Sequence, residues 1–423
     1  MAVMHDHRTI TRRTVLTSTG AAVAVSLARP AFAAAAPART LLKGGVVLSF
    51  DPAVGDFDRA DVLMEGRTIA AVRPNIAASD VRVIDAANMI VMPGFIDTHH
   101  HFYQSALRNV LANGLLSDYF RDISGAATAV YRPEDAYVGE LGGAIRSIDA
   151  GVTTITDVSQ VSNTPEHSDA MVKGLRESGI RAIYGYSRGS GPLAKYPQDV
   201  ERLQKQYFSS TDQLVTLAMG TAINAEQWAV ARKYGLRNWT HVVGNTPGVG
   251  PEDLAKLGDA DLMGDDNVYI HLTGCSAELM QKIKDTGGAI SISGPIEMAM
   301  RHGMPPIQLA LDHGIRPSLS SDVETTMAAD MFTQMRTAFT LQRALVNERA
   351  IKGETDLPKL LTARDVLEFA TIQGARADGL DRKTGSLTPG KEADIILLRA
   401  DLPNALPLNN AYGAVVTTMD TAR

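Results

Sequence analysis

Two histidines separated by one residue, His99 and His101, are the strongest chemical signal in the sequence. They end a predicted buried strand over 95–101. Side chains alternate along a strand, so His99 and His101 point to one face and His100 to the other. Two imidazoles on one face can share a metal ion. A solvated histidine cluster or a cloning-type tract is the alternative, and the Pro-Gly-Phe-Ile-Asp-Thr that precedes them disfavours it.

Three more side chains that can bind a metal end later predicted strands: His241, His271 and Asp322. If these strands are parallel, their carboxyl ends meet at one rim, where the side chains converge. Imidazole and carboxylate ligands with an open position suit zinc, or iron, manganese or cobalt. We therefore expect one divalent ion per chain, zinc before the others, held by His99, His101, His241 and Asp322.

The predicted chemistry is hydrolysis by a metal-activated water. Binding to such an ion lowers the pKa of water from about 15.7 to about 7. Asp322 can accept the proton of this water, and the hydroxide then attacks an electrophilic carbon. His271 could bind a second metal, or donate a hydrogen bond to the water or the substrate. The second role is favoured, because the predicted fourth strand, over 213–219, contains no lysine that could become a carbamylated bridging ligand.

A repeated helix–glycine–strand pattern must position these residues. In its clearest copy, a helix begins at Pro133, Gly151 ends it, and a β-branched strand over 152–158 follows. The whole pattern predicts strands over 95–101, 152–158, 180–186, 213–219, 238–243, 268–272, 289–293 and 315–320. Eight such units predict a (β/α)₈ barrel of the TIM type over residues 93–384. An open doubly wound sheet is the alternative, but neither G-x-G-x-x-G nor a P-loop is present.

Two segments outside the barrel have short apolar runs broken by turn residues. The first covers about 41–90, and the second contains Ala-Asp-Ile-Ile-Leu-Leu at 393–398. We expect residues 37–92 and 385–423 to pair into one small β-sandwich domain beside the barrel.

The first 36 residues have the features of a targeting signal. Arg12-Arg13 precedes a weakly apolar, small-residue stretch, and Ala31-Phe32-Ala33 has the A-x-A cleavage form. Paired arginines favour a twin-arginine signal, with an ordinary export signal or a disordered alanine-rich tail as alternatives. We expect export by the twin-arginine machinery after cleavage near Ala33, and a periplasmic or extracellular location.

The composition excludes several classes of protein. The net charge is −6 and no basic stripe occurs, so nucleic acid is not the expected partner. No apolar run approaches the roughly 20 residues that cross a bilayer. The chain has one cysteine, Cys275, so it forms no internal disulfide, and we expect this thiol to be buried as a small apolar group. The expected partner is a small-molecule substrate, and a homo-oligomer is compatible with the sequence.

The segment Pro-Gly-Phe-Ile-Asp-Thr-His-x-His over 93–101 resembles the signature of the amidohydrolase superfamily. The segment Gly-Ser-Leu-Thr-Pro-Gly-Lys-Glu-Ala-Asp-Ile over 385–395 resembles the return into its β-sandwich. The layout is similar to the branch with cytosine deaminase and the s-triazine and phenylurea hydrolases. The resemblance implies His99, His101, His241 and Asp322 as ligands, and His271 as the active-site histidine of the sixth strand.

The sequence departs from this branch in three places. Many of its deaminases have a glutamate proton shuttle where this chain has Gly244, which argues against simple deamination of a purine or pyrimidine. Ser320-Ser321-Asp322 replaces the usual Gly-Thr-Asp, and the chain ends at Arg423 before an expected last strand. The candidates for a shuttle or a substrate contact are Gln104, Glu297 and Glu324, with solvated-loop or helix-packing roles as alternatives. His302 is expected to be a loop residue.

Three functions are compatible with these residues and motifs. The first is a metal-dependent hydrolase of non-peptide carbon–nitrogen bonds in an amide, urea, carbamate or heteroaromatic amine. The second is an aminohydrolase that deaminates a nucleobase-like ring. The third, from another class, is an inactive metal- or ligand-binding protein, which is compatible with the absence of a glutamate at Gly244.

Overall fold

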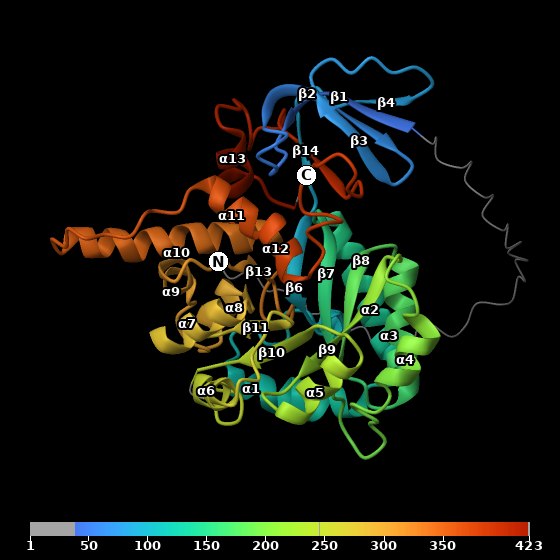
Figure 1. Cartoon of the computed structure of the whole chain (residues 1–423), viewed down its shortest axis with the longest axis vertical. Helices are drawn as coiled ribbons and strands as arrows, with labels where there is room; N and C mark the ends of the chain where they lie inside the picture. Colours follow the sequence, from blue (N-terminus) through green and yellow to red (C-terminus); the bar gives the residue numbers. More distant parts are fainter. Residues whose placement is uncertain (1–38, 245, 422–423) are drawn as a thin grey trace, which may run out of the picture.

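The computed structural model describes residues 39–244 and 246–421, so the predicted targeting signal over 1–36 lies outside the described residues. Two sheets organise the described part of the chain, one of eight strands and one of six. The larger sheet forms a barrel surrounded by helices, and the smaller sheet lies against one end of it (Figure 1).

The eight predicted barrel strands are all present, and each pairs in parallel with its neighbours in chain order. They are β6 (Phe95–His100), β7 (Val152–Ser159), β8 (Arg181–Ser187), β9 (Val215–Thr221), β10 (Asn238–Val242), β11 (Asn267–His271), β12 (Ala289–Ile292) and β13 (Ser318–Leu319). A parallel bridge between His100 and Asp322 joins the last strand to the first. The amide of Asp322 donates to the carbonyl of His99 at 3.0 Å, and the amide of His101 donates to the carbonyl of Asp322 at 3.0 Å. The predicted (β/α)₈ barrel is therefore confirmed.

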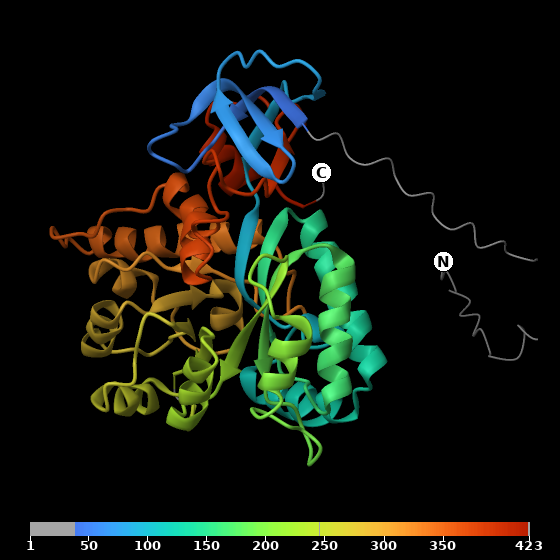
Figure 2. The ribbon, with the colours of Figure 1, turned by 45° about the vertical axis from the view of Figure 1, so that its right-hand side comes forward.

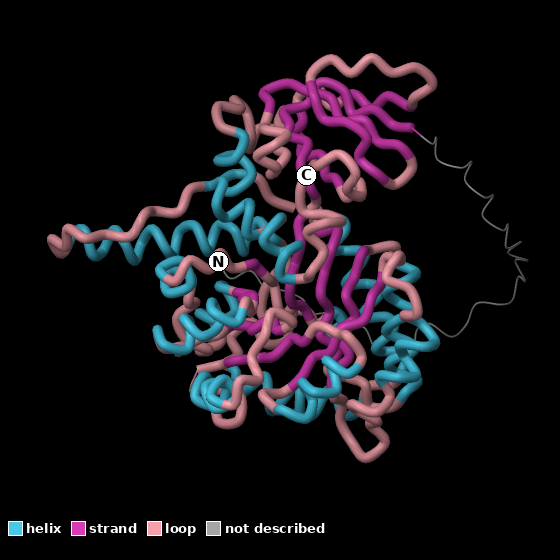
Figure 3. Tube along the Cα trace, viewed as in Figure 1, coloured by secondary structure: helices cyan, strands magenta, loops and turns pink. Residues whose placement is uncertain are grey.

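Helices cover the outside of the barrel (Figure 3). They include α2 (Pro133–Asp149), α3 (Pro165–Ser178), α4 (Val200–Tyr207), α5 (Ala225–Lys233), α6 (Pro251–Asp259), α7 (Ala277–Thr286), α8 (Gly294–Ala299), α9 (Ile307–Asp312) and α10 (Met331–Ile351). The helix predicted from Pro133 is confirmed. Gly179 and Gly287 end α3 and α7 in the left-handed conformation that glycine adopts without strain. Within the described residues, no helix has the length and apolarity to cross a membrane. Cys275 is only partly buried, so the expected burial of this thiol is incomplete.

The second sheet combines the two chain segments outside the barrel, as predicted. Its strands are β1 (Arg39–Val47), β2 (Phe57–Glu65), β3 (Thr68–Arg73), β4 (Arg82–Asp85), β5 (Met89–Pro93) and β14 (Ile395–Arg399). Strand β1 pairs with β4 through residues 40–43 and with β5 through residues 46–47, with bulges between them. This one sheet packs over a small apolar core that includes Leu42, Val62, Ile69 and Leu387.

The small sheet abuts the amino ends of the barrel strands (Figures 1 and 2). Strand β5 leads directly into β6, and the amide of Gly94 between them donates to the carbonyl of Asp394 at 2.9 Å. Arg181, at the start of β8, forms ion pairs with Glu392 and with Asp394, the latter at 2.7 Å. The carboxyl ends of the strands are therefore left free at the opposite rim, where barrel enzymes carry their active sites.

Candidate functional site

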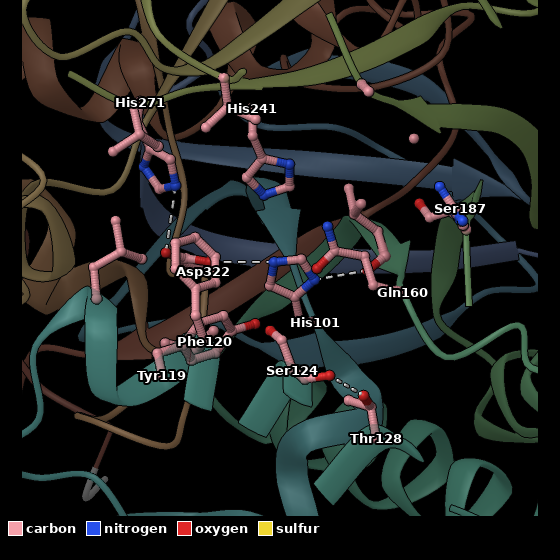
Figure 4. A pocket seen from close by; sticks show the side chains of 18 of the residues that line it. His101, Tyr119, Phe120, Ser124, Thr128, Gln160, Ser187, His241, His271 and Asp322 are labelled. Carbon is pink, nitrogen blue, oxygen red and sulfur yellow. Dashed lines mark hydrogen bonds and ion pairs between the residues drawn. The ribbon is translucent and has the colours of Figure 1, made fainter. Parts of the chain in front are cut away.

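Four histidines and one aspartate meet at the carboxyl rim of the barrel. They come from β6, β10, β11 and the residues after β13: His99, His101, His241, His271 and Asp322. Figure 4 shows His101, His241 and His271 arranged around Asp322. The ring centres of His99 lie 4.6 Å from His101 and 4.8 Å from His241. The structure thus brings together residues that lie more than two hundred positions apart in the sequence.

The spacing of the ligand atoms fits a single metal ion. Oδ1 of Asp322 lies 3.1 Å from Nε2 of His99 and 3.4 Å from Nε2 of His101. Tetrahedral ligands at about 2.1 Å from zinc lie roughly 3.4 Å from one another. Two groups, His99–His101–His241 and His99–His271–Asp322, each have ligand atoms within 4.8 Å of one another. These residues therefore form a His/Asp site that fits a divalent metal.

A hydrogen bond from Nδ1 of His101 leaves the other ring nitrogen, Nε2, free to bind a metal ion. Nδ1 of His101 lies 2.7 Å from the carbonyl of Val158, and because a carbonyl only accepts, Nδ1 carries the proton. The lone pair of Nε2 then points toward Asp322, as in metal sites where a backbone carbonyl fixes the tautomer. Burial, helped by the charge of His99, lowers the pKa of His101 to about 3, so the ring stays neutral.

Asp322 is held as an anion among these rings. Burial alone would raise its pKa, but the contact of its carboxylate with Nε2 of His99 and the nearby rings of His271, His99 and His101 hold the pKa well below its usual value. Its backbone φ is 61°, and His271 has a φ of 66°. Left-handed backbone in non-glycine residues is costly and concentrates at functional sites. Both side chains line the cavity.

His271 is oriented by a buried carboxylate behind it. Its Nδ1 lies 3.2 Å from Oε1 of Glu297, which also accepts the amide of Ser293 at 2.8 Å. Burial alone would lower the pKa of His271, but the hydrogen bond to Glu297 and the charges of Asp322 and Glu297 raise it. Nε2 of the same ring lies 3.6 Å from Oδ2 of Asp322. His271 therefore links the metal site to the buried carboxylate of Glu297.

The unusual Ser320-Ser321-Asp322 sequence has a structural role. The Ser321 hydroxyl donates to the carboxylate of Asp97 and lies 3.0 Å from Nδ1 of His100. The Ser321 amide also donates to Asp97 at 3.1 Å. His100 consequently points away from the other histidines, as the strand alternation predicts, and these contacts fasten the end of β6 to the residues that carry Asp322.

The site opens into a cavity of about 370 Å³. Aromatic and polar side chains share its wall, and Figure 4 shows several of them opposite the histidines. The wall includes Tyr103, Tyr119, Phe120, Ser124, Thr128, Gln160, Ser187, Arg188, Gln227, Met300 and His302, together with His101, His241, His271 and Asp322. The aromatic rings suit a planar ligand, and the polar groups suit heteroatoms on it.

The predicted substrate contacts lie behind this wall. Gln104 is buried and donates to the hydroxyls of Tyr103 at 2.9 Å and Tyr119 at 2.6 Å. Glu297 lies behind His271. Glu324 is buried and pairs with Arg146. None of the three is among the cavity-lining residues: Gln104 and Glu297 contact residues of the wall, whereas Glu324 contacts Arg146, which does not line the cavity.

His302 is the main residue that sequence reasoning missed. It is expected in a loop, yet it lines the cavity and its ring centre lies 4.7 Å from that of His271. It follows a short helix, and no periodic pattern marks it. Tyr119 and Arg188 also line the cavity from loops or irregular helix, where no strand alternation reveals the direction of a side chain.

Comparisons with known proteins agree with this geometry. The profile of the amidohydrolase family matches residues 90–419. A 5'-deoxyadenosine deaminase from Methanosphaera stadtmanae is 26% identical over 398 residues, which cover 86% of this chain and 88% of the relative. A 5-methylthioadenosine/S-adenosylhomocysteine deaminase from Pyrococcus furiosus is 25% identical over 399 residues, with 89% and 90% covered.

Solved structures share the fold. An adenosine deaminase from Xanthomonas campestris with bound zinc superposes with a TM-score of 0.78 at 20% identity, over 91% of this chain and 90% of that one. An atrazine chlorohydrolase from Arthrobacter aurescens complexed with zinc gives 0.77 at 22% identity, over 90% and 91%. The chain therefore belongs to the amidohydrolase family and is a metal-dependent hydrolase of non-peptide carbon–nitrogen bonds.

Proposed function

We propose that this enzyme hydrolyses the bond between an exocyclic nitrogen and a planar carbon of a heteroaromatic small molecule. One divalent ion, zinc in the first place, would be held by His99, His101, His241 and Asp322. The observation that carries the proposal is the convergence of these groups at the inner end of a cavity whose wall is partly aromatic. Such a cavity fits a flat ring with its reacting carbon directed at the metal site.

The protein's own residues can move the protons that the reaction requires. A divalent ion at this site supplies a water whose pKa is lowered from about 15.7 to about 7. Asp322, held as an anion, accepts a proton from the attacking water. His271, whose pKa is raised by Glu297, can donate a hydrogen bond or a proton to the substrate nitrogen.

The substituents on the ring would be polar. Arg188 lines the cavity and makes no ion pair with the described residues, so its charge is available to an acidic or hydroxyl-bearing substituent. The relatives from Methanosphaera and Pyrococcus are deaminases of adenosine-type nucleosides, which makes such nucleosides the first compounds to test.

A direct test is turnover by metal-reconstituted protein. The panel contains 5'-deoxyadenosine, S-adenosylhomocysteine, aminopyrimidines and amino-triazines, with an aryl amide and a phenylurea. We expect ammonia or amine release from at least one heteroaromatic compound, measured by an ammonia assay and chromatography. No turnover by protein that contains one metal per chain would contradict the proposal and favour a ligand-binding protein.

Gly244 favours a second candidate, hydrolysis of an amide, urea or carbamate. This position holds no carboxylate to shuttle a proton to a ring nitrogen. Amide-type substrates need protonation only of the leaving nitrogen, which His271 can reach from its place beside Asp322. Turnover of the aryl amide or phenylurea without that of the heteroaromatic amines would select this candidate.

We further propose that the enzyme acts outside the cytoplasm. Arg12-Arg13 and Ala31-Phe32-Ala33 support export by the twin-arginine machinery, a route that carries folded proteins. Fractionation of cells that express the full chain, compared with an Arg12→Lys, Arg13→Lys double variant, tests this. Export that does not depend on the two arginines would contradict the twin-arginine route.

A further inference from the structure

His302 is a buried histidine whose two ring nitrogens have no partner among the described residues. Its side chain is 4% exposed, and neither Nδ1 nor Nε2 forms a hydrogen bond. Its ring lies edge-on to that of His271, with an interplanar angle of 85°. A buried polar group without a partner destabilises the fold, so it is usually retained where a ligand completes it. The ring faces the cavity, where a bound molecule can supply that partner.

The backbone of His302 is fixed from two sides. Its amide donates to the carbonyl of Glu297 at 3.0 Å. Its carbonyl accepts the hydroxyl of Thr273 at 2.9 Å, and that hydroxyl in turn accepts the amide of Gly244 at 3.0 Å. Thr273 is buried, so this bridge is shielded from water. The ring is therefore held beside His271 by the residues that follow β10 and β11.

Gly244 allows this bridge to form. A Cβ atom at this position would lie 3.0 Å from the carbonyl oxygen of Thr273 and 3.4 Å from Cα of Gly274. Both neighbours are backbone, so a side chain would push the segment after β11 away and lengthen the contact from Thr273 to His302. The position where many deaminases of this branch have a glutamate therefore serves here to place a histidine.

We propose that His302 is a substrate-contacting residue that hydrogen-bonds a ring nitrogen or carbonyl oxygen beside the cleaved carbon–nitrogen bond, in the place of the glutamate absent at Gly244. The proposal rests on the proposed function for its choice of substrate. Burial lowers the pKa of His302 to about 3, so the neutral ring offers one donor and one acceptor at neutral pH. Whichever ring nitrogen faces the substrate can, depending on the tautomer, donate to a carbonyl oxygen or accept from a ring N–H.

The test compares His302→Ala and His302→Asn with the wild type and with His313→Ala as a control. His313 ends α9 away from the cavity lining. We expect His302→Ala to lower kcat/KM roughly tenfold to hundredfold on the compound that the wild type turns over. Metal content and melting temperature should remain those of the wild type, and His302→Asn should recover part of the activity, because its amide keeps a donor and an acceptor.

A second pair of variants tests the bridge. Thr273→Val removes the hydroxyl and should lower kcat/KM, but by less than His302→Ala does. Thr273→Ser keeps a hydroxyl and should have a kcat/KM close to that of the wild type. Equal kcat/KM for His302→Ala and the wild type, with metal content unchanged, would overturn the proposal. A lower kcat/KM of His302→Ala that is accompanied by a loss of metal would also overturn the proposal.

A binding measurement separates this proposal from the proposed function. Calorimetry with metal-depleted protein and 5'-deoxyadenosine reports on the contact without turnover. Suppose that the metal-loaded wild type turns over no heteroaromatic amine, but that the metal-depleted protein binds 5'-deoxyadenosine and His302→Ala weakens this binding about tenfold. The proposed function is then wrong, and the contact between His302 and the ligand is supported. Unchanged binding in His302→Ala would overturn the contact, whatever the turnover panel shows.

Discussion

Two buried clusters of side chains, one at each end of the barrel, differ in how their members are paired. At the amino end, Arg181 is almost fully buried and contacts both Glu392 and Asp394, so its charge is compensated. At the carboxyl end, Nδ1 of His99, Oε2 of Glu297 and both ring nitrogens of His302 are buried and unpartnered among the described residues. Nε of Arg237 and Nδ2 of Asn238 and Asn267 are also unpartnered near the amino end, so the difference concerns these two clusters and not the whole rims.

The contrast between the two clusters indicates that the Arg181 cluster contributes to stability and that the histidine cluster contributes to chemistry. Paired groups lower the energy of the folded chain, whereas unpaired groups and strained backbone raise it unless a ligand completes them. A barrel allows this separation because its strands carry the two rims about one strand length apart. Substitutions in the histidine cluster should therefore lower activity more than stability, and substitutions in the Arg181 cluster should lower stability more than activity.

The largest expected effect is loss of activity at the carboxyl end. His241→Ala removes one imidazole from the metal site, so we expect the bound ion to be lost and kcat/KM to fall by roughly 10³-fold or more. The free energy of unfolding of the metal-free protein should change little. Elemental analysis, a turnover assay and denaturant unfolding measure the three quantities. Full metal content in His241→Ala would refute its role as a ligand.

The next largest effect is loss of stability at the amino end. Arg181→Ala leaves two carboxylates without their shared cation, and we expect the free energy of unfolding to fall by about 3 kcal/mol. Arg39→Ala, which breaks an exposed pair with Glu65, is the matched control and should cost under about 1 kcal/mol. The kcat of the folded fraction of Arg181→Ala should match the wild type. Equal losses of stability in both variants would contradict the assignment of this end to stability.

The sequence predicted those parts of the fold and site that follow from the regular alternation of side chains along strands. The eight strands and the convergence of His99, His101, His241, His271 and Asp322 followed from strand alternation and from the shared rim of parallel strands. Gln104 and Glu324 could not be placed, because their direction depends on tertiary contacts with Tyr103 and Arg146. His302 was missed because its position depends on a hydrogen bond from Thr273, twenty-nine residues earlier.

A smaller effect concerns Asp378, a buried acid outside the metal site. Burial raises its pKa to about 8, against the hydrogen bond from Thr156 at 3.0 Å. The folded chain then keeps a proton that the unfolded chain loses above about pH 4, so stability falls as pH rises toward 8 and levels above it. We expect Asp378→Asn to remove up to about 1.4 kcal/mol of this fall per pH unit.

Urea unfolding of the wild type and Asp378→Asn at several pH values between 5 and 8 measures this difference. Other groups contribute equally to both curves, so the difference between the two slopes reports on Asp378 alone. Parallel slopes would show that this carboxyl group is ionised in the folded protein and that its burial is compensated.

The central claim is that His99, His101, His241 and Asp322 share one ion. The most direct measurement is anomalous diffraction at the zinc absorption edge from crystals of zinc-reconstituted protein. We predict one peak per chain, about 2.0–2.2 Å from a nitrogen of each of the three histidines and from a carboxylate oxygen of Asp322. A peak that touches fewer than three of these residues, or a folded protein with no peak at this rim, would contradict it.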